Sequence, residues 1–174
     1  MEKVTVDIEG ISPLLMHRFP LEPIEGQKNM TQEAQAKISE YCTPDGKLYV
    51  PGICVHRSLI GAGAYTKHKG QVTKSKIVAA CVFVMPEHLF LGQDTYEIDS
   101  RAVVVQGARI VRCRPRFDEW ALSFELEYDE VLISAVQMRE IVDNAGKRMG
   151  LLDFRPERKG PYGRFQVVKW DGGG

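Results

Sequence analysis

A stretch near the C-terminal end of the chain concentrates residue types that bind phosphate groups. From Gly150 to Phe165 it reads GLLDFRPERKGPYGRF, with three glycines, two prolines and four basic side chains in sixteen positions. Glycine lets backbone N–H groups approach a ligand closely, proline stiffens the chain, and arginine offers a planar set of donors that suits phosphate. The stretch predicts a loop that holds a phosphodiester backbone, with Arg155, Arg158 and Lys159 as its ligands. The alternative is a charged surface turn.

Charge is balanced over the whole chain but separated along it. The 174 residues include 23 Lys/Arg and 23 Asp/Glu. Residues 46–86 have six basic and no acidic side chains, and residues 100–117 have five arginines and no acid. Residues 118–143 have eight acids and one base, whereas residues 147–169 have seven bases and two acids. This separation predicts a basic face that suits a polyanion. It also fits docking between copies of the chain, or neutralisation within one fold.

The basic side chains between residues 65 and 76 form a second group of candidate phosphate ligands. We expect this segment to be a loop, because it is polar and follows a glycine-containing helix. Lysines in such a loop can follow the phosphates of a bound strand, or they can simply be solvated. The lysines concerned are Lys67, Lys69, Lys74 and Lys76.

Composition and motif spacing exclude several classes of protein. An apolar content of 44% supports one folded domain, which we expect over residues 1–171, with a disordered glycine tail at 172–174. No apolar run approaches 18 residues and the first residues lack a secretory signal, so we expect no membrane segment and a cytoplasmic location. The four cysteines form no C-x-x-C pair, and no phosphate-binding or dinucleotide-binding fingerprint is present. We therefore expect no metal site, no cofactor and no disulfide framework.

Hydrophobic periodicity predicts the order of the elements. Alternating apolar residues predict a strand over 3–9, and a capping box formed by Ser134 and Gln137 begins a helix over 134–149 that Gly150 ends. The polar segment at about 20–47 is expected to be a mobile insertion with a short helix inside it. The remaining predicted elements are a strand at 48–51, a helix at 53–64, a buried strand at 77–85, an edge strand at 89–98 and a last strand at 164–170.

A hairpin is predicted for residues 109–129. Its two strands would meet at a two-residue turn formed by Asp118 and Glu119, so that Cys113 opposes Phe124 and Arg112 opposes Glu125. The apolar side chains of this hairpin, Phe117, Trp120 and Phe124 among them, are expected in the core. On the other face Arg112, Arg114 and Arg116 would project together, at least one of them in an ion pair across the strands.

The predicted order of strands and helices indicates an α+β protein. It is compatible with a modified ferredoxin-like (RRM-like) fold, in which an antiparallel sheet has helices on one face and extended loop insertions.

Three stretches of the sequence, taken in order, resemble the RAMP superfamily of CRISPR-associated proteins. They are GISPLLMHRF after the first strand, LYVPGICVHRSLIGAG at the first helix, and RPERKGPYGRF near the C-terminal end. The nearest branch is the backbone subunit of CRISPR effector complexes, or a virus-borne relative of it. The chain departs from the family pattern where Ile53 and Cys54 replace the usual pair of serines after Pro51 and Gly52.

The resemblance implies a domain that binds single-stranded RNA or DNA through its backbone, without sequence preference, and coats the strand as a homo-oligomer or filament. It implies a prokaryotic cell or a virus-infected host cell. It also implies that the strand is contacted by His17 and Arg18 after the first strand, by Arg57 on the first helix, and by the matched loop residues Gly160, Tyr162, Gly163 and Arg164.

Two other functions stay open at this stage. One is a metal-independent endoribonuclease that uses His17 as a general acid or base, since histidine titrates near neutral pH. No second catalytic partner is evident in the sequence, so we expect a protein that is not an enzyme. The other is an assembly subunit that binds no nucleic acid. The Tyr162 ring is expected either to stack on a base or to plug the loop against the sheet.

Overall fold

The computed structural model describes residues 1–66 and 74–173, which form helices and antiparallel sheets. The chain is thus of the α+β class, as predicted. The largest sheet consists of four strands in the order β4-β8-β1-β9, and every neighbouring pair is antiparallel. Its strands are β1 (Glu2–Gly10), β4 (Val82–Met85), β8 (Ala121–Tyr128) and β9 (Phe165–Gly172).

Alternation along the strands decides which face of this sheet is buried. In β1 the side chains of Val4, Val6 and Ile8 are fully buried, while the residues between them point away from the core. Because strand side chains alternate between the two faces, the opposite face presents polar residues to solvent. The strand predicted over residues 3–9 is confirmed.

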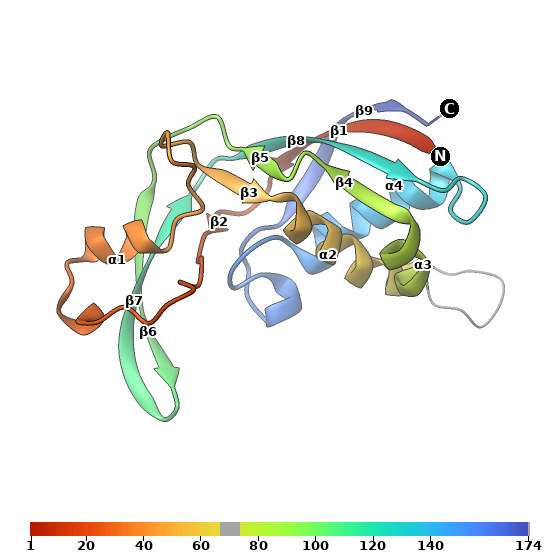
Figure 1. Cartoon of the computed structure of the whole chain (residues 1–174). Helices are drawn as coiled ribbons and strands as arrows, with labels where there is room; N and C mark the ends of the chain where they lie inside the picture. Colours follow the sequence, from red (N-terminus) through yellow and green to blue (C-terminus); the bar gives the residue numbers. More distant parts are fainter. Residues whose placement is uncertain (67–73, 174) are drawn as a thin grey trace.

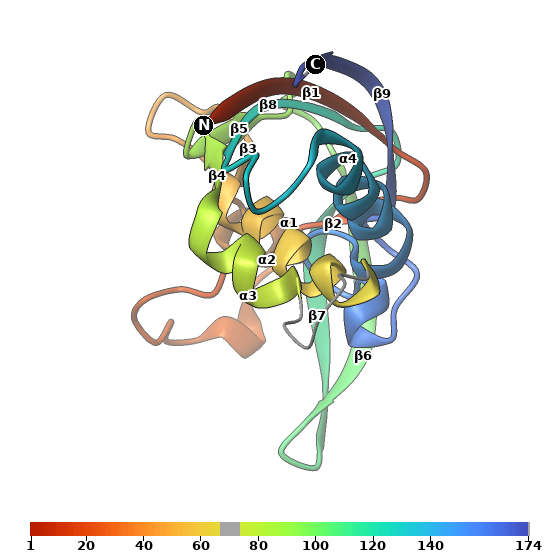
Figure 2. The ribbon, with the colours of Figure 1, turned by 90° about the vertical axis from the view of Figure 1, so that its right-hand side faces the viewer.

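Helices cover the buried face of the large sheet. Figures 1 and 2 show α2 (Gly52–Ala62), α3 (Lys74–Cys81) and α4 (Ala135–Asn144) on one side of it. The capping box of α4 is formed as predicted, because Gln137 N donates to Ser134 Oγ at 3.3 Å and Ser134 N donates to Gln137 Oε1 at 3.2 Å. The predicted helix continues as a π-helical turn, η3 (Ala145–Met149), and ends at Gly150.

The path of the chain through this layer alternates strand and helix. From β1 it passes through α2 to β4, and from β8 it passes through α4 to β9. As a result β1 lies between β8 and β9, which makes the first and last strands of the layer neighbours. Short helical turns η2 (Gly63–Tyr65) and η4 (Pro156–Arg158) lie in the connections.

A long hairpin projects from the body of the protein (Figure 1). Its strands are β6 (Glu97–Val105) and β7 (Ala108–Phe117), and β7 also pairs with the short β2 (Leu14–Leu15). The two residues at its tip, Gln106 and Gly107, both have positive φ, at 50° and 81°. Two such residues form the turn whose twist matches that of a two-stranded ribbon.

Two smaller parts complete the structure. Helix α1 (Gln32–Ile38), with the 3₁₀ turn η1 (Gln27–Asn29) before it, lies in the predicted insertion and packs beside β7. Strands β3 (Tyr49–Pro51) and β5 (His88–Phe90) form a separate two-stranded sheet.

The predicted hairpin of residues 109–129 is wrong. Strand β7 pairs with β6, so Cys113 faces Ser100 and Arg112 faces Arg101, whereas β8 pairs with β1 and β4 in the large sheet. Strand β7 has a possible turn at each end, Gln106-Gly107 before it and Asp118-Glu119 after it. The pair Gln106-Gly107 has the backbone conformation that closes a tight hairpin. The three aromatic side chains expected in the core are nevertheless buried: Phe117, Trp120 and Phe124.

The predicted buried strand at 77–85 is also wrong over its first half. Helix α3 continues to Cys81, and only Val82–Met85 form a strand. Val78 and Cys81, three residues apart, face the core, while the two alanines between them are exposed. This spacing of buried residues is that of a helix, not of a strand. The strand expected over 89–98 is divided between β5 and β6, which belong to different sheets.

The predicted glycine tail begins too early. Gly172 is part of β9 and pairs with Val4 of β1. The last strand is therefore longer than the sequence indicates.

Candidate functional site

The glycine-rich loop between Gly150 and β9 is closed on itself. Gly163 has a φ of +72°, and a Cβ atom there would collide with the carbonyl oxygen of Leu151. A Cβ atom at Gly160 would collide with the carbonyl oxygen of Phe154 in the same way. The glycines therefore permit close packing of the loop against its own backbone.

The backbone donors of this loop are also used internally. Leu151 N donates to Gly163 O at 2.9 Å, Tyr162 N to Phe154 O at 3.1 Å, and Gly163 N to Pro13 O at 2.8 Å. The expectation that glycine N–H groups here are presented to a ligand is therefore wrong, because these donors already have partners. Any ligand contact from this loop must come from its side chains.

The ring of Tyr162 plugs the loop against the hairpin. Its side chain is only 8% exposed, and its hydroxyl group accepts a hydrogen bond from Arg101. The guanidinium groups of Arg101 and Arg116 lie 4.8 Å and 5.8 Å from the ring centroid. Of the two roles expected for Tyr162, the buried ring fits the plug and leaves no face for a base.

The basic residues of the loop differ in what holds them. Arg155 is bound by Glu157, with an Nε–Oε2 distance of 2.8 Å, and by the carbonyl oxygen of Leu152 at 2.7 Å. Arg158 and Lys159 are exposed, and neither forms an ion pair within the described residues. Arg164 is half-buried, and its backbone N–H donates to Ser12 Oγ at 3.0 Å. Among the described residues the loop cations without an ion pair are therefore Arg158 and Lys159, which are exposed, and Arg164, which is half-buried.

His17 is positioned by a buried charge network that sequence analysis did not identify. Its Nδ1 lies 3.6 Å from Oδ2 of Asp153, and the same oxygen accepts a hydrogen bond from Arg114 at 2.5 Å. Arg114 also reaches Asp99 at 3.4 Å. Burial would raise the pKa of Asp153, but its contacts with His17 and Arg114 outweigh burial and hold that pKa well below its usual range.

Three of the predicted basic residues come together beside this network. Burial raises the pKa of the Tyr41 hydroxyl, and the nearby charges of Arg18 and Arg57 oppose that rise. Burial likewise raises the pKa of the Cys54 thiol, against the opposing charges of Arg155 and Arg57. Arg18 and Arg57 thus both lie near Tyr41, and Arg57 and Arg155 both lie near Cys54, although Arg18 and Arg155 are 137 positions apart in the sequence.

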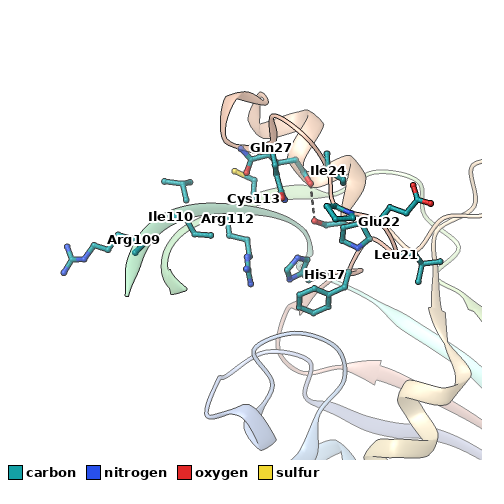
Figure 3. Close-up of a pocket in the computed structure, with 16 residues that line it drawn as sticks. His17, Leu21, Glu22, Ile24, Gln27, Arg109, Ile110, Arg112 and Cys113 are labelled. Carbon is teal, nitrogen blue, oxygen red and sulfur yellow. Dashed lines mark hydrogen bonds between the residues drawn. The ribbon is translucent and has the colours of Figure 1, made fainter. Parts of the chain in front are cut away.

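A groove of about 860 Å³ lies between β7 and the segment that leads from His17 to α1 (Figure 3). One wall presents Arg109 and Arg112 of β7, and the other presents His17 and Phe19, whose rings are 4.5 Å apart. In the view of Figure 3 the side chain of Arg112 lies between those of Arg109 and His17. The five arginines of residues 100–117 were the sequence signal for this site. Because β7 was predicted to pair with the wrong strand, Arg112 was expected to face Glu125 instead of the groove.

Of the other predicted lysines, the structure describes Lys74 and Lys76, both in α3. Lys67 and Lys69 lie outside the described residues. Lys74 is fully buried in α3, and its Nζ donates to the carbonyl oxygen of Leu132 at 2.7 Å. The prediction that Lys74 contacts phosphates is therefore wrong.

The outer face of the large sheet has the opposite charge. Its exposed or half-buried side chains include five acids, and their cationic neighbours are Lys3 and Lys169. Lys3 lies 3.7 Å from one of the acids, Glu127, and Lys169 lies 2.7 Å from another, Asp171. The acids are Asp7, Glu9, Glu125, Glu127 and Asp171.

Comparison with known proteins assigns no family to the chain: no family model matches it, and no curated protein matches it. Within residues 1–66 and 74–173, no cluster of three or more His, Cys, Asp or Glu side chains is arranged to hold a metal ion. None of the helices in that part of the chain has the length and apolar character needed to span a bilayer.

Proposed function

We propose that this protein binds single-stranded RNA or DNA through the strand's phosphate backbone, without sequence preference. The observation that carries the proposal is a set of four arginines at and beside the groove. Arg109 and Arg112 of β7 line it, and Arg18 lies between the lining residues His17 and Phe19. Arg57 of α2 lies with Arg18 near the Tyr41 hydroxyl. Arginine binds phosphate with a planar set of donors. The acidic outer face of the large sheet would repel the same ligand, so the groove side is the side that binds.

A finer fold assignment supports this proposal. The chain passes through β1, α2, β4, β8, α4 and β9 and gives the sheet order β4-β8-β1-β9. Two strand–helix–strand units interleaved in this way are what a ferredoxin-like core requires. The proposal therefore includes a ferredoxin-like core and, from the three matching sequence stretches, a relationship to the RAMP superfamily.

Coating of the strand by several copies is part of the proposal. The projecting hairpin exposes apolar side chains near its tip, where Val104 is 67% exposed and Val111 is 59% exposed. Solvent-exposed valines on a projecting element favour contact with another molecule. A second copy bound on the same strand is the partner that fits, and light scattering with and without a long oligonucleotide tests it.

A second candidate function, a metal-independent endoribonuclease, is favoured by the pair of His17 and Asp153. A carboxylate beside Nδ1 can orient an imidazole for proton transfer at its other nitrogen. The groove arginines are not suited to be its catalytic partner, because arginine does not give up its proton, whereas the carboxylate of Glu22, which also lines the groove, can accept one. Cleavage of labelled RNA by the native protein but not by His17→Ala would establish this activity.

The first test measures binding of labelled 30-mers by fluorescence anisotropy at low and moderate salt, using single-stranded RNA, single-stranded DNA and duplex DNA. We expect single strands to bind with a logarithmic salt slope of about −0.7 for each phosphate contact. Absence of binding to all three would contradict the proposal and favour an assembly subunit.

A further inference from the structure

We propose that the aromatic face of the small β3–β5 sheet is a second part of the binding site, where bases of the bound strand stack. This aromatic face is made of Tyr41, Tyr49, His88 and Phe90. The inference rests on the proposed function, because it assigns a surface to the bases of a strand whose phosphates lie along the basic groove.

The four rings are already arranged as neighbours. Tyr49 and His88 are stacked with their centroids 3.9 Å apart, and Phe90 is 6.5 Å from each of them. Tyr41 lies 5.9 Å from Tyr49, on the segment that runs beside β3. Strand pairing sets this order, since Tyr49 is directly opposite Phe90.

Three of these rings, those of Tyr49, His88 and Phe90, face away from the core, and Tyr41 packs partly against it. Val50 and Leu89, the middle residues of the two strands, are buried, and alternation turns their neighbours outward. Phe90 is 49% exposed, which is high for a phenylalanine in a sheet. After the rings have packed against one another, part of the aromatic face therefore remains accessible to a ligand.

The charges around the rings favour a nucleic acid as the occupant. Burial raises the pKa of the Tyr41 hydroxyl, and Arg18 and Arg57 lie close enough to oppose that rise; Arg18 is also the neighbour in sequence of the groove residues His17 and Phe19. A further cation, Lys47, has its Nζ 5.6 Å from the centroid of Phe90. Aromatic side chains bordered by cations are the arrangement that binds single strands without sequence preference, since every base offers a π-face.

The experiment compares a 30-mer of deoxythymidine with an abasic 30-mer that has the same phosphates but no bases. The variant is Phe90→Ala, and the matched control is Phe83→Ala, which removes a phenylalanine of similar exposure, 52%, from β4 of the large sheet. Circular dichroism and gel filtration without oligonucleotide verify that each variant is folded and has the native mass.

We expect Phe90→Ala to weaken binding of the thymidine strand by about five-fold to a hundred-fold, because stacking on one aromatic ring is worth about 1–3 kcal/mol. Binding of the abasic strand should be unchanged, and Phe83→Ala should behave as the native protein with both strands. Tyr49→Leu, which keeps the apolar volume without the ring, should weaken binding of the thymidine strand alone.

Three results would overturn the inference. If the native protein binds neither strand, the proposed function fails and the inference fails with it. If it binds both strands and Phe90→Ala is unaffected, or is weakened equally for both, the proposed function stands and the stacking surface is rejected. If Phe90→Ala changes the mass of the free protein, the aromatic face is a contact between copies of the chain.

Discussion

The outer face of the large sheet and the groove side of the molecule hold their charged groups in different ways. On the outer face, Lys3 and Lys169 each lie beside an acid, so the positive charge of that face is locally balanced. On the groove side, Arg18 and Arg57 are exposed and form no ion pair within the described residues. Where a cation is placed, and whether it has a partner, thus matters more for binding than how many cations the chain contains.

The groove side also contains arginines that serve the fold. Arg114 is buried between Asp153 and Asp99, and Arg101 is held by Asp99 and Tyr162. Burying these guanidinium groups is tolerated because each has an acidic partner. Cations close to the core therefore hold the loop and the hairpin together, and those at the rim are left for a ligand.

The largest effect on the groove side is expected from Gly163→Ala, which disturbs the glycine-rich loop and leaves the large sheet unchanged. We expect it to lower the free energy of unfolding by about 3 kcal/mol, since the positive φ and the collision with Leu151 O add to each other. The control is Gly46→Ala, which has a φ of +88° but no atom within 4 Å of the new Cβ, and should cost about 1 kcal/mol. Urea unfolding measures both, and equal losses would contradict the closed-loop interpretation.

The electrostatic difference between the two sides is tested by paired double variants. Arg18→Ala with Arg57→Ala should weaken single-strand binding by about thirty-fold, because each ion pair near water contributes about 1 kcal/mol. The logarithmic salt slope should also become shallower by about 1.4. Lys3→Ala with Lys169→Ala removes the same charge from the outer face and should leave affinity within about two-fold. Equal weakening by both pairs would show that only net charge matters.

The buried network is tested by pH. Because the pKa of Asp153 is lowered in the folded state, its contribution is fully present above the unfolded pKa of about 3.9 and is lost as the pH falls below it. Asp153→Asn should therefore destabilise the protein at pH 7 by about 1 kcal/mol, a value reduced by solvent screening because the side chain is 33% exposed. The difference from the native protein should shrink below about pH 4.

The matched control for Asp153 is Asp171→Asn on the outer face, whose exposed carboxylate lies 2.7 Å from Lys169. Its effect should stay within about 0.5 kcal/mol at every pH. Thermal unfolding between pH 3 and 7 measures both variants, and a pH-independent loss for Asp153→Asn would reject the charge network.

The smallest expected effect belongs to Tyr162→Phe. This variant keeps the ring but removes the acceptor for Arg101, so it should cost about 0.5–1 kcal/mol of stability. Binding should not change, because the ring is buried in the loop. A loss of affinity without a loss of stability would show that Tyr162 contacts the bound strand.

Sequence analysis succeeded where the physical cause was local. The alternation in β1 and the capping box of α4 depend on residues only a few positions apart, and both were predicted. The partner of β7 depends on the competition between two possible turns, and the run at 77–85 has an apolar composition that suits a helix as well as a strand. These two predictions failed because nothing close in the sequence distinguishes the alternatives.

The site divides in the same way. Arg18, Arg57 and Arg155 were predicted from their residue types and their places in the three matching stretches, and they lie together in the structure. Arg109 was not singled out, and Arg112 was assigned to an ion pair, because their position in the groove depends on the correct partner strand. Asp153 was not predicted, since its partners His17 and Arg114 are far away in the sequence.

By itself, the sequence determined the α+β class, the amphipathic elements and the separation of charge into blocks, because periodicity, capping and composition act over short distances. Only the tertiary structure decided which cations are free to bind. Strand pairing buries Arg114 and exposes Arg109, loop closure occupies the glycine N–H groups, and the small sheet turns three aromatic rings outward. Each of these outcomes depends on contacts between segments far apart in the chain, whose energies no local pattern contains.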